Sequence, residues 1–169
     1  EVIEAKNIFN LDYKNISILT HPKSYIHAIV KFKNELVKML LHEPDMKIPI
    51  YSSIYNPKEL KIKTKPLNLK IINDLKLNEV DHKKFPSINI LNKMPKKTSL
   101  FETVLITIND YLVYKFLKNK ISFPKLVKLI NKISNLNEFQ KFKKIKPKNV
   151  DDIYRLRDYV SSKMDSLAI

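Results

Sequence analysis

The chain has no glycine, no cysteine and no tryptophan among its 169 residues. Glycine makes up about 7% of an average protein, so its absence excludes whole classes of site. No P-loop, no G-x-G-x-x-G cofactor turn and no G-x-S-x-G nucleophile elbow can form from these residues. The lack of cysteine excludes disulfides, thiol nucleophiles and thiolate-held metals. The 169 residues therefore do not contain a complete nucleotide-binding enzyme.

Long apolar runs are missing too. No stretch approaches the roughly 18 apolar residues of a membrane span, and no signal peptide opens the chain, so we expect no membrane partner. Because the first residue is Glu1 and not Met, we expect the true N-terminus, with any targeting segment, to lie upstream. The 44% hydrophobic content suffices for a folded core and excludes a disordered tail.

Arginine is nearly absent from a strongly basic chain. The formal net charge is +15, yet the only arginines are Arg155 and Arg157, beside 30 lysines. A basic chain attracts phosphates and nucleic acid, but arginine is the usual reader of bases and the lysines are spread along the whole sequence. Lys, Asn and Ile share A/T-rich codons, so biased base composition also explains the 30 Lys, 16 Asn and 22 Ile. We expect a solvated basic surface and keep a Lys-rich nucleic-acid-binding domain as an alternative.

Period-two alternation predicts a small antiparallel sheet in the first third of the chain. A short helix over residues 1–9 precedes strands expected at 15–20, 24–32 and 36–42, with Asn34-Glu35 as the turn between the last two. The segment Pro44-Asp45-Met46 then leaves the sheet as a loop. Prolines and lysines predict an extended linker over residues 56–84, with short ordered pieces such as 71–77.

Helical spacing dominates the remainder of the chain. Ser99 and Glu102 form a predicted capping box for a helix that continues to about Leu117, and a second helix begins at Ser122-Phe123-Pro124. Asn149 is the expected cap of a third helix, whose inward stripe is Ile153, Leu156, Val160, Met164 and Leu167. The fold class is therefore α+β: a small, mostly antiparallel sheet with flanking helices, followed by a C-terminal helical bundle domain.

Three segments taken together resemble one enzyme family. They are Glu1-Val2-Ile3-Glu4-Ala5, His21-Pro22-Lys23-Ser24-Tyr25-Ile26-His27 and Pro44-Asp45-Met46-Lys47-Ile48-Pro49-Ile50. In order and spacing they are similar to 1-deoxy-D-xylulose 5-phosphate reductoisomerase of non-mevalonate isoprenoid biosynthesis, whose second and third segments have the patterns His-Pro-Gln-Ser-x-Ile-His and Pro-Asp-Met-Arg-x-Pro-Ile. The resemblance covers essentially the whole chain, with departures at Thr98, where the family has Gly, and at Ile106 and Asp110, where it has Asn and Glu.

The resemblance implies a fragment of a longer enzyme. Residues 1–55 would be the second half of the catalytic and dimerisation domain, 56–84 the linker, and 85–169 the C-terminal helical domain. The NADPH-binding domain, with its glycine-rich turn, would lie upstream. We therefore expect the isolated chain to be inactive and the full-length protein to be a homodimer.

The same resemblance implies an NADPH-dependent rearrangement and reduction of a sugar phosphate, 1-deoxy-D-xylulose 5-phosphate, to 2-C-methyl-D-erythritol 4-phosphate. A divalent ion, Mg²⁺ or Mn²⁺, would be held by an upstream Asp-x-Glu pair and by Glu1. Glu1 would thus be a catalytic, substrate-binding and metal-binding residue. From the residues alone, the favoured interpretation is that Glu1 is an ordinary first-turn glutamate stabilised by the helix dipole; only the resemblance favours a metal ligand.

Four further residues take roles from the resemblance. His27 would lie at the active site and Ser24 near the substrate phosphate, while Pro44 and Met46 would contact the nicotinamide. Without the resemblance, His27 is a hydrogen-bonded sheet histidine and Met46 is hydrophobic filler in a loop. His42 and His82 have no expected partners and are predicted to be surface residues.

Two broader questions stay open at this point. A non-catalytic dimerisation module descended from the family would show the same segments. The A/T-rich composition, joined to this pathway, favours a plastid-type organelle, with the cytoplasm as the location if the source is bacterial.

Overall fold

The computed structural model describes residues 1–56 and 61–167. The chain forms two compact units: a sheet unit, Ile18–Val80, and a helical unit made of Glu1–Ser17 and Asp81–Ile169. The helical unit is therefore discontinuous in sequence, because the first 17 residues belong with the last 89. In the part of the chain that the structure describes, no helix combines the length and the apolar character that crossing a membrane requires.

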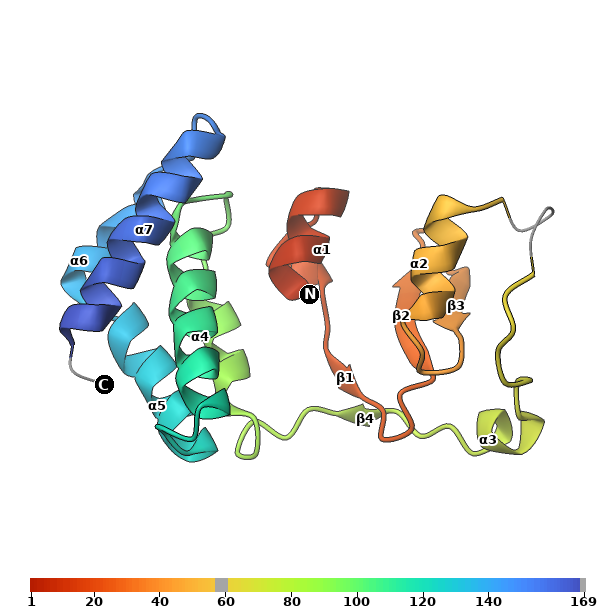
Figure 1. Cartoon of the computed structure of the whole chain (residues 1–169). Coiled ribbons are helices and arrows are strands. Elements are labelled where there is room, and N and C mark those ends of the chain that lie inside the picture. Colours follow the sequence, from red (N-terminus) through yellow and green to blue (C-terminus); the bar gives the residue numbers. More distant parts are fainter. Residues whose placement is uncertain (57–60, 168–169) are drawn as a thin grey trace. The chain divides into compact units, whose positions relative to one another are not determined.

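The sheet unit contains two separate antiparallel strand pairs (Figure 1). Strand β1 (Leu19–Thr20) pairs with β4 (Asn78–Glu79), and β2 (Ile26–Lys31) pairs with β3 (Val37–Leu41) as a hairpin. Two short helices follow the hairpin, α2 (Lys47–Ile54) and α3 (Leu69–Asn73).

The hairpin turn shows how the chain manages without glycine. The Phe32 amide donates to the Leu36 carbonyl at 2.9 Å, and the Glu35 amide donates to the Phe32 carbonyl at 3.1 Å. Glu35 adopts a φ of 66°, the left-handed position that a three-residue hairpin loop normally gives to glycine. The predicted turn at Asn34-Glu35 is confirmed, with a non-glycine residue in its most restricted position.

The helical unit is built around three long helices. They are α4 (Phe101–Leu117), α5 (Phe123–Ser134) and α7 (Val150–Ser166), and α4 packs against both others (Figure 1). The shorter elements are α1 (Val2–Phe9), η1 (Tyr13–Asn15), η2 (Pro86–Lys93), α6 (Asn137–Gln140) and η3 (Lys141–Lys144).

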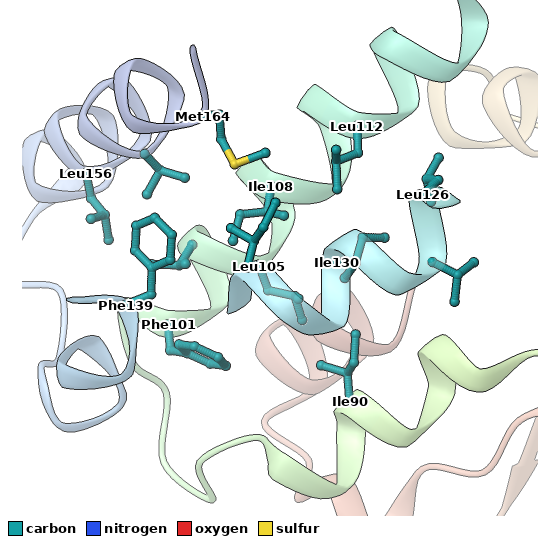
Figure 2. Packing of buried hydrophobic residues seen from close by; sticks show 14 of the residues in the cluster. Ile90, Phe101, Leu105, Ile108, Leu112, Leu126, Ile130, Phe139, Leu156 and Met164 are labelled. Atoms are coloured by element: carbon teal, nitrogen blue, oxygen red, sulfur yellow. The ribbon is translucent and has the colours of Figure 1, made fainter. Parts of the chain in front are cut away.

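The hydrophobic core belongs to the helical unit (Figure 2). Its fully buried side chains are Val104, Ile108 and Leu112 of α4, Phe139 of α6, and Val160 and Met164 of α7. Among the described residues of the sheet unit, only Tyr25 is a buried hydrophobic. The hairpin instead exposes apolar side chains on both strands: Ile29, Val30, Phe32, Leu36, Val37, Met39 and Leu40.

The α+β class predicted from the sequence is confirmed, and the local differences have physical causes. The strand expected at 15–20 is reduced to Leu19–Thr20, because Asn15 is the last residue of η1 and residues 16–18 lie outside any strand. The loop expected at Pro44-Asp45-Met46 is confirmed, but helix α2, which was not predicted, begins directly after it at Lys47. Pro49 lies in the first turn of this helix, where a missing N–H leaves no helical bond unmade. Within the predicted linker, residues 69–73 form α3, and residues 57–60 lie outside the described residues.

The prediction of a capping box at the start of α4 was wrong. The Ser99 hydroxyl does accept from the Phe101 amide, at 3.3 Å, but the Glu102 carboxylate bonds to side chains of α1 and η1 instead of reaching back to Ser99. On α7, the cap at Asn149 is confirmed: its side chain accepts from the Asp152 amide at 2.9 Å. Of the expected stripe on that helix, Ile153 and Leu167 lie on the surface.

Candidate functional site

Antiparallel pairing places the start of β2 beside the end of β3. Ile26 lies opposite Leu41, and the His42 amide donates to the Tyr25 carbonyl at 3.2 Å. The residues in and beside these strand ends are called the hairpin cluster below: Ser24, His27, His42, Glu43, Pro44 and Met46. The hairpin thus gathers four of the five residues predicted for the site.

His27 is the extra residue of a β-bulge. The register passes from Ile26 opposite Leu41 to Ala28 opposite Leu40, so His27 has no partner of its own. Bulges of this kind turn a side chain away from the regular pleat. The imidazole of His27 is exposed and stacks on that of His42, with ring centroids 3.7 Å apart and planes 7° apart.

The prediction that His42 lacks a partner was therefore wrong. Besides the stack on His27, its Nδ1 lies 2.6 Å from the Glu43 carbonyl oxygen, which fixes the ring. His82 also has a partner, since its Nδ1 lies 2.9 Å from Asn89 Oδ1. Stacking across a bulge depends on strand register, which the positions of the two histidines in the sequence do not specify.

A buried tyrosine is hydrogen-bonded to the hairpin cluster. Tyr25 is 7% exposed, and its hydroxyl donates to the Glu43 carboxylate at 2.6 Å. This hydrogen bond, with burial and the negative charge of Glu43, raises the pKa of Tyr25 above its ordinary value. The bond ties Glu43, two residues after β3, to Tyr25, the residue before β2. The two ends of the hairpin are therefore held together by a side-chain contact as well as by the backbone.

Ser24 has an unusual backbone. Its φ is 54°, the left-handed region that residues with a Cβ seldom occupy. The Ser24 amide donates to the His21 carbonyl at 3.1 Å, closing a tight turn, and the side chain is exposed. Such backbone conformations cost of order 1 kcal/mol or more and gather at functional sites.

Pro44 and Met46 lie where β3 passes into α2. Met46 is the N-cap residue of α2 and is 65% exposed, and Pro44 is exposed as well. The adjacent Asp45 holds the bend, because its Oδ1 accepts from the Lys47 amide at 2.9 Å. Two apolar side chains are thereby presented to solvent at the cluster.

Glu1 belongs to the helical unit, and the structure does not place it relative to the hairpin cluster. It is the N-cap residue of α1, exposed and without a side-chain cap hydrogen bond, so its carboxylate oxygens are not used by the helix. No group of three or more His, Cys, Asp or Glu side chains suited to a metal occurs within the described ranges 1–56 and 61–167. Glu1 is accordingly a single carboxylate donor.

Behind Glu1, α1 is tied to α4 by a buried polar network that the sequence analysis missed. Lys6 Nζ donates to Glu102 Oε1 at 2.8 Å, and the Tyr13 hydroxyl donates to the same oxygen at 2.8 Å. Glu102 follows Lys6 by 96 positions in the sequence. No sequence signal pointed to this contact, because the spacing of Ser99 and Glu102 predicted a capping box instead.

Two surface grooves on the helical unit include none of the predicted site residues in their linings. One, about 380 Å³, runs between α4 and α7 and includes Ile106, Asp110 and Arg157. The other, about 330 Å³, includes Lys141, Asp152 and Arg155.

Comparison with known proteins gives consistent matches. A family model described as the DXP reductoisomerase C-terminal domain matches residues 41–162. A protein named 1-deoxy-D-xylulose 5-phosphate reductoisomerase from Pelagibacter ubique is 50% identical over 169 residues, which is 100% of this chain and 44% of that protein. One of the same name from Chloroherpeton thalassium is 38% identical over 131 residues, 78% of this chain and 34% of that protein.

Solved structures of similar proteins share the fold. A DOX-P reductoisomerase with fosmidomycin and magnesium superposes with a TM-score of 0.84 at 22% identity, covering 98% of this chain and 42% of the other. The reductoisomerase of Zymomonas mobilis in complex with NADPH gives a TM-score of 0.77 at 21% identity, covering 98% of this chain and 43% of the other. The chain thus spans less than half the length of the proteins that it matches.

Proposed function

This chain belongs to the 1-deoxy-D-xylulose 5-phosphate reductoisomerase family, and from that premise we propose that it acts as the C-terminal part of such an enzyme. The reaction would convert 1-deoxy-D-xylulose 5-phosphate to 2-C-methyl-D-erythritol 4-phosphate with NADPH and a divalent ion. The observation that carries the proposal is the 50% identity to a relative of that name over all 169 residues. Since the chain covers 44% of that relative, the remaining machinery would come from residues outside this sequence.

Glu1 would contribute one metal ligand. Its exposed carboxylate, which makes no side-chain cap hydrogen bond, has the donor chemistry that Mg²⁺ and Mn²⁺ prefer. A single carboxylate does not fill an octahedral site, and the described residues offer no other group of ligands, so the other donors would lie upstream. When bound, the ion supplies Lewis-acid polarisation of the substrate's carbonyl oxygen.

The hairpin cluster would bind the substrate and the cofactor. The exposed hydroxyl of Ser24, held out by its left-handed backbone, would donate to the substrate phosphate, and His27 would shape the pocket beside it. Pro44 and Met46 would lie against the nicotinamide of NADPH, which supplies the hydride. Exposed apolar side chains fit that role because they orient the ring and exclude water without entering the chemistry.

A homodimer would cover the hairpin. The hairpin formed by β2, β3 and their turn exposes seven large apolar side chains from Ile29 to Leu40, and apolar patches of this kind mark protein interfaces. Upstream residues of the same catalytic domain would cover part of this surface and the second subunit the rest.

Two further assignments belong to the proposal. The predicted division into a catalytic part (1–55), a linker (56–84) and a helical domain (85–169) would describe the functional domains, although residues 1–17 pack with the helical unit. The relatives described above are bacterial, which supports a bacterial cytoplasm over a plastid-type organelle.

The test is a chimera in which the part of the Pelagibacter ubique relative that this chain does not match is joined ahead of Glu1. We expect it to oxidise NADPH when given 1-deoxy-D-xylulose 5-phosphate and Mg²⁺ or Mn²⁺, and we expect the 169-residue chain alone not to. In the chimera, Glu1→Gln should lower kcat/KM by roughly 100-fold or more, because a ligand of the Lewis acid is lost.

The matched control is Glu138→Gln, which removes a carboxylate of the helical unit that bonds only to side chains of α7. It should leave kcat/KM within about twofold. A well-folded chimera that binds NADPH but turns over no substrate would refute the proposal, and Glu1→Gln with full activity would refute the role of Glu1.

A further inference from the structure

Helix α1 is attached to the helical unit mainly by polar contacts. It has eight residues, and the only one buried is Lys6, while Ile3 is partly buried against the hydrophobic core. A helix this short is not stable by itself in water, where roughly 12 residues or more are needed. The order of α1, and of the Glu1 carboxylate at its N-cap, therefore depends on what holds Lys6.

Lys6 has a partner for each of its three N–H groups. Its Nζ lies 2.8 Å from Glu102 Oε1, 2.9 Å from Thr98 Oγ1 and 3.4 Å from Asn7 Oδ1. The same ammonium also lies 5.3 Å from the centre of the Tyr13 ring.

Glu102 is satisfied in the same way. Its Oε1 accepts from Lys6 and from the Tyr13 hydroxyl, and its Oε2 accepts from Asn7 Nδ2 at 3.2 Å. Burial, together with the hydrogen bond to Glu102 and its charge, raises the pKa of Tyr13 well above the ordinary value, so the phenol stays a donor. Helix α1 and η1 are thus both joined to the first turn of α4 through this carboxylate.

The burial of this pair argues for positioning. The side chains of Lys6 and Glu102 are 4% and 6% exposed, and taking two charges out of water costs about as much as their attraction returns. A buried ion pair whose hydrogen-bonding atoms all have partners instead specifies one arrangement of the two helices, because any other arrangement leaves a charge unpaired. The network therefore fixes the rotation and height of α1 on α4.

Thr98 completes the same network from the segment before α4. Its hydroxyl both accepts from Lys6 and donates to Asn7 Oδ1, at 3.2 Å. The ammonium of Lys6 is thus held from two sides, by the Glu102 carboxylate and by the Thr98 hydroxyl.

We propose that Glu102, acting through Lys6, is a positioning residue that holds α1 so that the Glu1 carboxylate is presented to the divalent ion. This inference rests on the proposed role of Glu1 as a metal ligand. The Ala5 amide donates to the Glu1 carbonyl at 2.7 Å, so Glu1 is bonded into the first turn of the helix whose other end carries Lys6.

The experiment measures Mn²⁺ binding by electron paramagnetic resonance in the chimera, at a temperature where circular dichroism shows every variant folded. Glu102→Gln should weaken Mn²⁺ binding roughly 10-fold, the low end of the range for groups that orient metal ligands. Tyr13→Phe, which keeps the Lys6–Glu102 pair, should weaken it roughly twofold to threefold. Hydrogen exchange of the α1 amides should accelerate in both variants.

Glu138→Gln is again the matched control, since Glu138 also accepts from a lysine, Lys163 at 3.3 Å, and a tyrosine, Tyr159 at 3.2 Å, without touching α1. Its Mn²⁺ affinity should equal that of the unsubstituted chimera. If Glu102→Gln lowers the melting temperature while Mn²⁺ affinity and α1 exchange stay unchanged, the network is only structural and the inference is overturned. Glu1→Gln is measured alongside: if it too leaves the affinity unchanged, the role of Glu1 is wrong and the inference falls with it.

Discussion

At the residue scale, the absence of glycine sends other residues into left-handed backbone conformations. Asn10, Ser24, Glu35 and Asn119 have φ between 51° and 66°. Asparagine tolerates this region better than most residues do, whereas serine and glutamate gain no such relief. Two of the four positions, Ser24 and Glu35, lie at opposite ends of the same hairpin. Backbone conformational cost is therefore concentrated in the unit that carries the hairpin cluster.

The strain at Glu35 gives a first prediction. Glu35→Gly should stabilise the hairpin by about 0.5 kcal/mol, because relief of the left-handed conformation, about 1–2 kcal/mol, exceeds the entropy that glycine loses on folding. The Lys31–Glu35 ion pair is exposed on both sides, and its loss should cost little. The measurement is hydrogen exchange of the amides that bond between β2 and β3, which should be slower in Glu35→Gly than in the unsubstituted chain.

Lys33→Gly in the same loop is the comparison, since Lys33 has no positive φ. It should speed exchange of the same amides. Equal effects of the two substitutions would show that the conformation of Glu35 carries no cost.

The predicted site shows what single residues in a sequence can and cannot reveal. Ser24, Pro44 and Met46 were picked out by their motifs, and the antiparallel hairpin explains why two distant motifs lie close together. The stack of His27 on His42 could not be foreseen, because it depends on one extra residue in β2. The roles of these residues stay predictions until the chimera is tested.

At the element scale, helices were predictable where local signals determined their ends. The limits of α4 and α7 follow from apolar spacing and from the Asn149 cap. Helix α2 was missed because Pro49 and its neighbours look like loop residues, and the helix is stabilised at its start by Asp45. The capping-box prediction failed because the Glu102 carboxylate already accepts from Lys6, Tyr13 and Asn7, and a charge-assisted bond to a buried lysine is stronger than one to a backbone amide.

The cap of α7 gives a prediction at this scale. Asn149→Ala should destabilise the helical unit by about 1 kcal/mol, because the Asp152 amide loses its acceptor. The matched change is Ser122→Ala at the N-cap of α5, where the side chain makes no cap hydrogen bond. Urea unfolding followed by circular dichroism should show a lower midpoint for the first substitution alone, and equal midpoints would contradict the assignment of the cap.

At the scale of the whole molecule, stability is distributed unevenly. The cluster of buried hydrophobic residues lies in the helical unit. In the described part of the sheet unit, Tyr25 is the one buried hydrophobic residue, and the hairpin exposes apolar side chains to solvent. Sequence periodicity found apolar residues in both places and could not tell burial against this chain from burial against another. That distinction requires the tertiary structure.

Core truncation should therefore affect the units differently. Ile108→Ala, at a side chain with 0% exposure, should destabilise the helical unit by about 2–5 kcal/mol through lost burial and a cavity. Ile106→Ala, on the same helix at 45% exposure, should cost less than about 1 kcal/mol. Exchange of the β2–β3 amides should change in neither variant. Faster exchange there in Ile108→Ala would mean that the units unfold as one.

The discontinuity of the helical unit also has a consequence in time. During synthesis the ribosome releases α1 before the sheet unit, and the sheet unit before Glu102, which pairs with Lys6. Domains generally fold as they emerge, yet this short helix has to wait for a partner 96 positions later, and closing so long a loop carries an entropic cost. The helices from α4 to α7 are contiguous and can assemble without it. Helix α1 is thus made before the sheet unit but is fixed in place only after that unit has been made.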